Sequence, residues 1–291
     1  MKQGFNQLEK YDAYVERADL DAAFEKAQEV LSDPINPEDF IDIYGEGVAS
    51  DQKYVEKFEK IYKEELERGS EFDKSAYKLG KIFEAIVFQH AELSNWFGQH
   101  ATTVETSRYD DIKNGVDTIV EFDEDGNTNH LALAIDVTSS ASTKDKFERI
   151  QSEIDHGHLA EIKYFVSDAM NIRGHKSNVP RVVVGANHET VYNVVNAWME
   201  GDNKALADHP IQIKILSEIS IQLASFRKYC ETIKKHDLAE IYRKGQEIVD
   251  RIIAEKNFSR ADMAGLDLDD VYRGIVMYAQ SIAEANGATK E

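Results

Sequence analysis

Two segments near the middle of the chain alternate in side-chain character, and a polar connector joins them: the first alternates apolar and polar residues, and the second alternates large and small apolar residues up to Asp136. The first runs from Gly115 to Phe122 and the second from Leu131 to Thr138. Such alternation, rich in β-branched and aromatic residues, is typical of β-strands, and the Asp-Gly-Asn sequence of the connector is a strong turn signal. The pattern therefore predicts a β-hairpin whose turn spans residues 123–129.

The predicted hairpin carries two aspartates, Asp117 and Asp136, one at each strand. A turn centred at Gly126 and Asn127 gives pairing partners whose numbers sum to 253, which places the aspartates opposite each other on one face. Directly opposed Cβ atoms lie about 4.5–5.5 Å apart, and like charges there are destabilising. A divalent cation between the carboxylates would remove this penalty. The alternatives are a register slip by one residue, which sends them to opposite faces, or one aspartate that is protonated or solvated at an edge.

Helical periodicity dominates both ends of the chain and surrounds the predicted hairpin. Before the hairpin we expect three helices, over 19–31, 51–68 and 73–97, and then a strand over 101–106. After it we expect a helix over 142–155, then strands at 160–166 and 181–185 separated by a loop over 167–180. Four further helices are expected over 189–199, 211–235, 238–256 and 267–285. The simplest architecture is a mixed α/β protein, with a central sheet flanked by helices.

Composition and charge narrow the function classes. The chain has 291 residues, 42% hydrophobic and 30% charged, and its single cysteine, Cys230, predicts a reducing, cytoplasmic location. No run approaches the ~20 apolar residues of a membrane span, and the N-terminus lacks a signal-peptide pattern, so no membrane partner is expected. The net charge of −20 argues against a nucleic-acid partner, because phosphate binding needs a positive surface.

The charge is unevenly distributed along the sequence. Residues 1–72 carry 19 acidic and nine basic side chains, whereas residues 141–181 carry seven basic and six acidic ones. An acidic shell can therefore coexist with a neutral or basic cleft. The acidic helices are expected to keep the protein dispersed in water or to bind a protein partner.

The order of predicted elements, together with its acidic residues, resembles the core of the PD-(D/E)XK nuclease-like superfamily. That family has an αβββαβ core with an acidic residue on the first helix, an aspartate near the second strand and a (D/E)-x-K triplet on the third. Here Gly80 and Glu84 match the helix pattern, Asp117 matches the second-strand aspartate, and Asp136-Val137-Thr138 occupies the position of the triplet. The resemblance implies a restriction-endonuclease-like core over residues 73–187, between an acidic helical region (1–72) and a helical region (188–291) packed on the core.

The chain departs from the family pattern at Thr138, which stands where the family has its lysine. That lysine is expected to orient the attacking water and to stabilise the developing charge, a role that a neutral hydroxyl cannot fill. Some members of the family supply the lysine from another element. The candidates here are Lys144 and Lys146 at the start of the next helix, and Lys163 on the following strand. If none of them reaches the site, the fold is a degenerate nuclease that binds without cutting.

The resemblance implies a Mg²⁺- or Mn²⁺-dependent nuclease that hydrolyses phosphodiester bonds. Hard oxygen ligands are what Mg²⁺ accepts, and it uses only one or two carboxylates. Asp117 and Asp136 are the expected ligands, with the Val137 carbonyl as a further oxygen and Glu84 joining through a water or a second metal. Glu84 could instead pair with Lys81 on a solvent-facing surface. The expected substrate is nucleic acid, DNA rather than RNA, and the alternative is a non-catalytic protein-interaction module.

One neighbouring motif is a further candidate for the same site. Asp110 and Asp111 lie in the segment that leads into the hairpin. They could add a ligand at the entrance to the strand, although paired aspartates before a turn are usually solvated.

Overall fold

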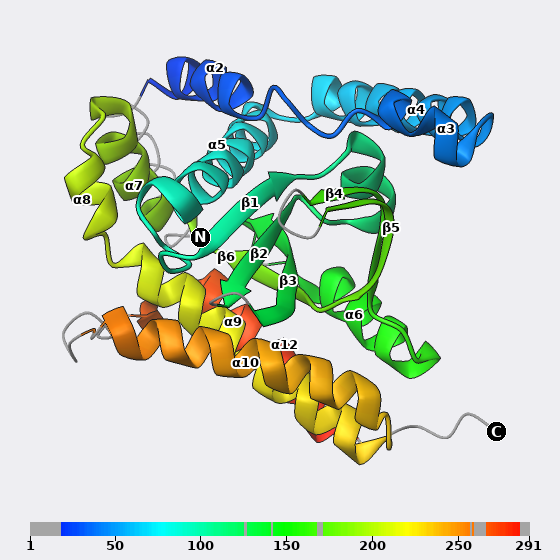
Figure 1. The fold of residues 1–291 in the computed structure, drawn as a ribbon. Coiled ribbons are helices and arrows are strands. Elements are labelled where there is room, and N and C mark those ends of the chain that lie inside the picture. Colours follow the sequence, from blue (N-terminus) through cyan, green and yellow to red (C-terminus); the bar gives the residue numbers. More distant parts are fainter. Residues whose placement is uncertain are drawn as a thin grey trace.

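A computed structural model describes residues 19–124, 127–140, 142–167, 171–256, 258 and 266–285. The protein is a mixed α/β protein, as the sequence predicted, in which helices surround a small mixed sheet (Figure 1). The elements before the sheet are α2 (Leu20–Val30), η1 (Pro37–Phe40), α3 (Ile41–Tyr44), α4 (Gly47–Arg68) and α5 (Glu71–Leu93). The described helices include none that is long and apolar enough to cross a membrane.

The central sheet has four strands in the order β1-β2-β3-β6. β1 (Ala101–Glu105), β2 (Thr118–Glu124) and β3 (Asn127–Thr138) form an antiparallel meander, and β6 (Arg181–Gly185) pairs with β3 in parallel. A parallel neighbour requires a crossover, and the chain makes it through α6 (Lys144–His156). The crossover also carries a separate two-stranded sheet, β4 (Ala160–Ser167) and β5 (Ile172–Val179).

The register of the hairpin agrees with the prediction along most of its length. Thr118 pairs with Ile135 and Ile119 with Ala134, so that partners sum to 253. Near the turn the strands run further than expected, because Glu124 pairs with Asn127 after a register irregularity that follows Phe122. The predicted turn centre includes Gly126, which lies outside the described residues. The irregularity restores the expected register before the strands reach the two aspartates.

The predicted loop over 167–180 is wrong, because this segment contains the strand β5. Its sequence, Ile-Arg-Gly-His-Lys-Ser-Asn-Val, has few apolar residues, and most of its side chains are at least partly exposed. β5 is a strand because its backbone pairs with β4, not because it buries an apolar face. Strand pairing of this kind leaves almost no signal in the sequence.

The helices follow the prediction with shifts at their ends. α5 begins at Glu71 because Ser70 accepts a hydrogen bond from the Asp73 N–H while the Asp73 carboxylate accepts one from the Ser70 N–H, a capping box. α4 begins four residues earlier than predicted, at Gly47. After β6 come α7 (His188–Glu200), α8 (Asn203–Ala207), α9 (Ile211–Thr232), α10 (His236–Lys256), η3 (Leu266–Leu268) and α12 (Asp270–Glu284). The short helix α8 was not predicted.

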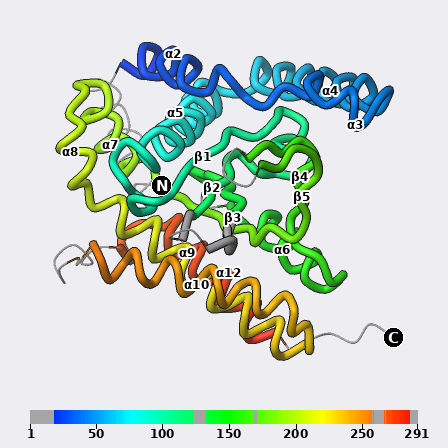
Figure 2. Tube along the Cα trace, in the orientation of Figure 1, coloured from blue at the N-terminus to red at the C-terminus, as the bar shows by residue number. Residues whose placement is uncertain are grey.

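Helices cover both sides of the central sheet. α5 contacts β1 and β3 and is covered on its outside by α2, whereas α9 and α12 pack against β6 on the other side. Figure 2 shows α2 and the α3–α4 segment along one side of the molecule and α9 and α10 along the opposite side. One hydrophobic cluster takes buried side chains from α2, α5, the sheet and the C-terminal helices. The division into three regions stays a prediction.

Candidate functional site

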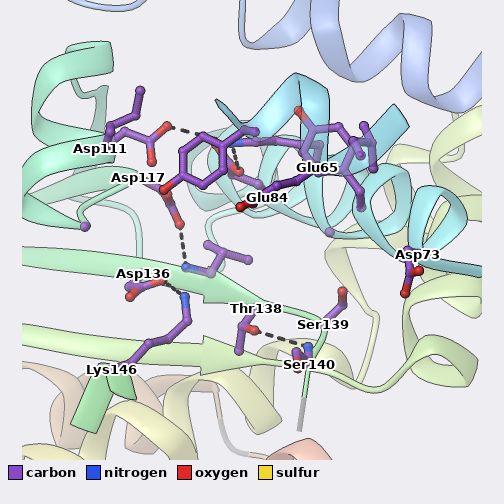
Figure 3. Close-up of a pocket in the computed structure, with 18 of the residues that line it drawn as sticks. Glu65, Asp73, Glu84, Asp111, Asp117, Asp136, Thr138, Ser139, Ser140 and Lys146 are labelled. Carbon is purple, nitrogen blue, oxygen red and sulfur yellow. Dashed lines mark hydrogen bonds and ion pairs between the residues drawn. The ribbon is translucent and has the colours of Figure 1, made fainter. Parts of the chain in front are cut away.

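A cavity of about 790 Å³ lies where α4 and α5 face the carboxyl end of β3 (Figure 3). Its lining includes six carboxylates: Glu65 on α4, Asp73 on α5, and four more that come from three separate parts of the chain. Glu84 lies on α5, Asp111 precedes β2 in a short π-helical turn (Asp110–Asn114), and Asp117 and Asp136 belong to the hairpin. The structure thus brings Glu84, Asp117 and Asp136 together with Val137 and Thr138 at one pocket.

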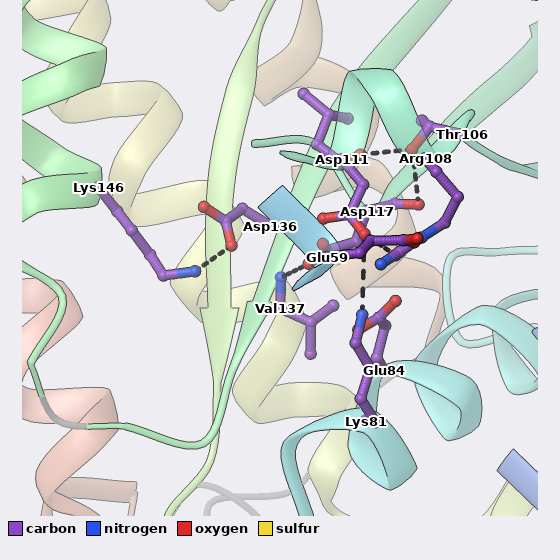
Figure 4. Close-up of polar contacts among 11 residues, drawn as sticks. Glu59, Lys81, Glu84, Thr106, Arg108, Asp111, Asp117, Asp136, Val137 and Lys146 are labelled. Atoms are coloured by element: carbon purple, nitrogen blue, oxygen red, sulfur yellow. Dashed lines mark hydrogen bonds and ion pairs between the residues drawn. The ribbon is translucent and has the colours of Figure 1, made fainter. Parts of the chain in front are cut away.

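Asp117 is fixed at the start of β2 by the neighbouring strand. Its backbone N–H donates to the Ile135 carbonyl at 3.0 Å, and its Oδ2 accepts from the Val137 N–H at 2.7 Å. Asp136 is buried and forms an ion pair with Lys146 of α6. Figure 4 shows both aspartates beside β3, with Lys146 reaching Asp136 from α6. The two carboxylates therefore share a pocket, as their predicted register requires.

Glu84 does form the pair with Lys81 that the sequence allowed. The Lys81 Nζ lies 2.6 Å from Glu84 Oε2 and 3.8 Å from Asp111 Oδ2. The pair is not on a solvent-facing surface, because the Lys81 and Glu84 side chains are only 25% and 12% exposed and both line the pocket. Lys81 is therefore a second cation of the site, which the sequence indicated only as a partner of Glu84.

The adjacent aspartates Asp110 and Asp111 have different roles. Asp110 is buried and accepts hydrogen bonds from the N–H groups of Lys163 and Tyr164, at 2.8 and 3.0 Å, so that it attaches β4 to the turn. Asp111 faces the pocket and forms an ion pair with Arg108. Of the two, only Asp111 is placed to contribute to the pocket.

Of the three candidate lysines, only Lys146 reaches the pocket. Lys144 is exposed and pairs with Glu148 one turn along α6, 3.2 Å away. Lys163 pairs with Asp51 and lies over the rings of three tyrosines, because its strand pairs with β5 and not with the hairpin. A role in the site would need this strand to lie beside the hairpin, and the structure does not place it there. Thr138 lines the pocket, and its Oγ1 accepts from the Ser140 N–H at 3.1 Å.

Burial raises the pKa values of three of the carboxyl groups in the pocket. Burial, and next the negative charge of Asp117, raise the pKa of Glu84 to about 8, although Lys81 opposes the shift. Burial is also the main cause that raises the pKa values of Asp111 and Asp136 to about 6, and Asp117 adds to both. Burial acts to lower the pKa of Lys146, but the Asp136 and Asp117 carboxylates outweigh it and raise that pKa. The pocket lining thus has six carboxyl groups and three cationic side chains, Lys81, Lys146 and Arg149.

The carboxylates of the pocket suit a hard divalent cation that keeps several of its waters. Excess carboxylate charge in a partly buried pocket is what such a cation neutralises, and Mg²⁺ needs only one or two protein carboxylates because it keeps several waters. The described residues contain no group of three or more His, Cys, Asp or Glu side chains placed to hold a metal ion. The residues present thus fit a water-rich Mg²⁺ site held by Asp117 and Asp136, and not a cage built wholly from protein ligands.

The raised pKa values predict how stability depends on pH. A carboxyl group with a higher pKa in the folded chain holds its proton more tightly there than in the unfolded chain. The unfolding free energy therefore falls as the pH rises from the pKa of the unfolded state to that of the folded state. For Glu84 that range runs from about 4.5 to about 8. We expect the urea midpoint to fall between pH 5 and pH 8, and Glu84→Gln to make this fall shallower.

Glu148→Gln, at the exposed start of α6, controls for the loss of one negative charge. A Glu84→Gln profile with the same slope as wild type would show that this carboxyl does not titrate in the range.

The sequence alone missed several residues that line the pocket. Among them are Arg149 on α6, Glu65 and Tyr62 on α4, and Asp73 and Tyr77 on α5. α4 and α5 precede the hairpin in the chain, and no local pattern indicates that they face it. Spacing on one helix could have grouped Lys146 with Arg149, since residues three apart share a face.

Comparisons with protein-family models, with curated proteins and with solved structures gave no match to this chain.

Proposed function

We infer that this protein is a metal-dependent nuclease of the PD-(D/E)XK-like type, which hydrolyses phosphodiester bonds in nucleic acid with Mg²⁺ or Mn²⁺. The order α5, β1, β2, β3, α6 and β6, with β3 and β6 parallel, is the order that such a core would have. In this interpretation β4 and β5 are an insertion in the crossover. The observation that carries the proposal is that Lys146 meets Asp136 in the pocket that also holds Asp117 and Glu84.

The residues would divide the chemistry as follows. Asp117 and Asp136 would hold the metal, with the Val137 carbonyl as a further oxygen and Glu84 joining through a water or a second metal. The bound metal would supply a Lewis acid for a non-bridging oxygen and a water of lowered pKa. Lys146 would take the role that Thr138 cannot, because a charged ammonium group beside Asp136 can orient water and stabilise charge on the phosphate.

The matched lysines of α6 provide the test. Lys146→Met should lower the rate of Mg²⁺-dependent cleavage by about 100-fold or more, the cost of removing one preorganised charge-stabilising donor. Lys144→Met should cut at the wild-type rate, because this side chain lies outside the pocket. The measurement is cleavage of labelled single- and double-stranded DNA and RNA with Mg²⁺ or Mn²⁺, with EDTA as a blank. Equal rates for the two variants would remove Lys146 from the mechanism.

A second candidate function is a non-catalytic protein-interaction module on a degenerate nuclease fold. Two observations favour it. Lys146 and Lys81 already form ion pairs with Asp136 and Glu84. Thr138 also stands at the position of the lysine in the triplet. A folded wild-type protein that cuts none of the four substrates with either metal would favour this candidate. Its acidic N-terminal helices would then be the surface to test for a protein partner.

A further inference from the structure

Two exposed tyrosines line the side of the pocket formed by α4 and α5. Tyr62 on α4 and Tyr77 on α5 are 51% and 45% exposed, and both belong to the pocket lining. Among the described residues only one other aromatic side chain, Phe72, is as open to solvent, and it does not line the pocket. Of the three exposed Phe and Tyr side chains among the described residues, two thus line the candidate site.

Charged side chains of both signs surround the same pocket. Lys146 and Arg149 come from α6, beside the hairpin aspartates, whereas α4 and α5 bring the carboxylates of Glu65, Asp73 and Glu84 and one cation, Lys81. Figure 3 shows Lys146 and Asp73 at opposite sides of the pocket, with the hairpin aspartates nearer to Lys146. Arg149 is exposed and donates to the Lys113 carbonyl at 3.0 Å. The two cations of α6, with a metal held by the hairpin aspartates, would favour phosphate on that side, whereas Glu65 and Asp73 would disfavour it beside the tyrosines.

A nucleic acid that matches this arrangement must present a phosphate at one side and a base face at the other. Tyrosine rings stack on bases of any sequence, but in a duplex the base faces are already stacked on each other. A duplex would also bring a second phosphate backbone toward a protein with a net charge of −20. An unpaired strand has free base faces and can bend its backbone into a pocket.

We propose that the pocket binds an unpaired nucleic-acid strand, with a phosphodiester beside Asp117, Asp136 and Lys146 and a base stacked on Tyr62 or Tyr77. This inference rests on the proposed nuclease function and specifies its substrate class. The tyrosines are binding residues that position the strand and take no part in the chemistry.

The test measures binding separately from cleavage. A fluorescently labelled mixed-sequence strand and a hairpin duplex of the same composition, each as DNA and as RNA, are titrated with protein in Ca²⁺, and gels show that they stay intact. Ca²⁺ takes oxygen ligands as Mg²⁺ does. We expect the unpaired strand to bind more tightly than the hairpin, and the DNA and RNA arms to show which sugar is preferred.

Tyr62→Ala and Tyr77→Ala should weaken strand binding by at least about fivefold where the ring stacks on a base. Tyr62→Phe and Tyr77→Phe keep the ring and should bind as wild type. Phe72→Ala removes an equally exposed ring outside the pocket and should have no effect. Because all three side chains are exposed, the variants are expected to fold, which thermal melts would verify.

Each outcome decides the inference independently of the nuclease proposal. The inference is overturned if the duplex oligonucleotide binds as tightly as the unpaired one, or if neither alanine variant weakens binding of the unpaired one. Mg²⁺-dependent cleavage by wild type would in that case leave the nuclease proposal standing. Tyrosine-dependent strand binding without any cleavage supports the inference and overturns the proposed catalysis. The absence of binding to all four ligands overturns the inference, and the cleavage assay then decides the nuclease proposal by itself.

Discussion

Asp117→Asn should abolish Mg²⁺-dependent cleavage and leave the fold intact. The substitution removes the charge that a divalent cation needs but keeps an oxygen that can accept the Val137 N–H, now bound at 2.7 Å. We expect the rate to fall by at least about 100-fold. Removing a residue that only hydrogen-bonds to a metal ligand already lowers metal affinity or activity by about 10- to 100-fold. The measurement is single-turnover cleavage of the preferred substrate, with the melting temperature recorded for both proteins.

Asp145→Asn is the matched control, because Asp145 lies in the first turn of α6, is exposed and does not line the pocket. This variant should cut at the wild-type rate. If Asp117→Asn retains most of the activity while its thermal melt matches wild type, the hairpin aspartates are not the ligands. A nuclease activity would then have to be assigned to another part of the chain.

Asp269→Ala should destabilise the protein by about 3–5 kcal/mol, the typical cost of breaking a buried ion pair. Asp269 caps α12 through the N–H groups of Val271 and Tyr272, at 2.9 and 3.1 Å. Its other oxygen accepts from the Asn187 N–H at 3.0 Å and pairs with Lys214, whose side chain is 4% exposed. Alanine would leave an ammonium group buried without its carboxylate. The measurement is the unfolding free energy from urea titration.

A second capping aspartate separates the loss of a cap from the loss of the buried pair. Asp19 caps α2 with a hydrogen bond from the Ala22 N–H, 3.0 Å long, at an exposed position. Asp19→Ala should cost about 0.5–2 kcal/mol, the range for a helix cap alone. If the two substitutions prove equally costly, the Lys214–Asp269 pair contributes nothing beyond the cap.

The hairpin shows how far local patterns can determine a site. Alternation assigned both strands, and the register of Thr118 and Ile135 follows the predicted sum of 253. The strands extend into the predicted turn, where Glu124 pairs with Asn127. A register irregularity between Phe122 and Glu124 returns the pairing to the predicted sum. Burial of one face penalises any slip by one residue, so the core side chains specify the register more firmly than the turn does.

The choice among the lysines lay beyond the sequence. Lys144 and Lys146 are two residues apart on one helix, and the direction of each side chain depends on how α6 packs. Lys163 is on a strand of the expected kind, yet that strand belongs to a second sheet formed with β5. Side-chain direction and strand partnership are decided by contacts between distant segments, which a local pattern does not contain.

The sequence by itself determined most of the helices and strands apart from β5 and α8, the hairpin, and the pair of aspartates that it carries, because these depend on periodicity and pairing between near neighbours. Only the tertiary structure decided that α4 and α5 line the pocket, that Lys81 pairs with Glu84 and Lys146 with Asp136, and that Tyr62 and Tyr77 open onto it. Those residues meet through packing of segments that are far apart in the chain, and burial in the shared pocket is also what raises the pKa values of its carboxyl groups.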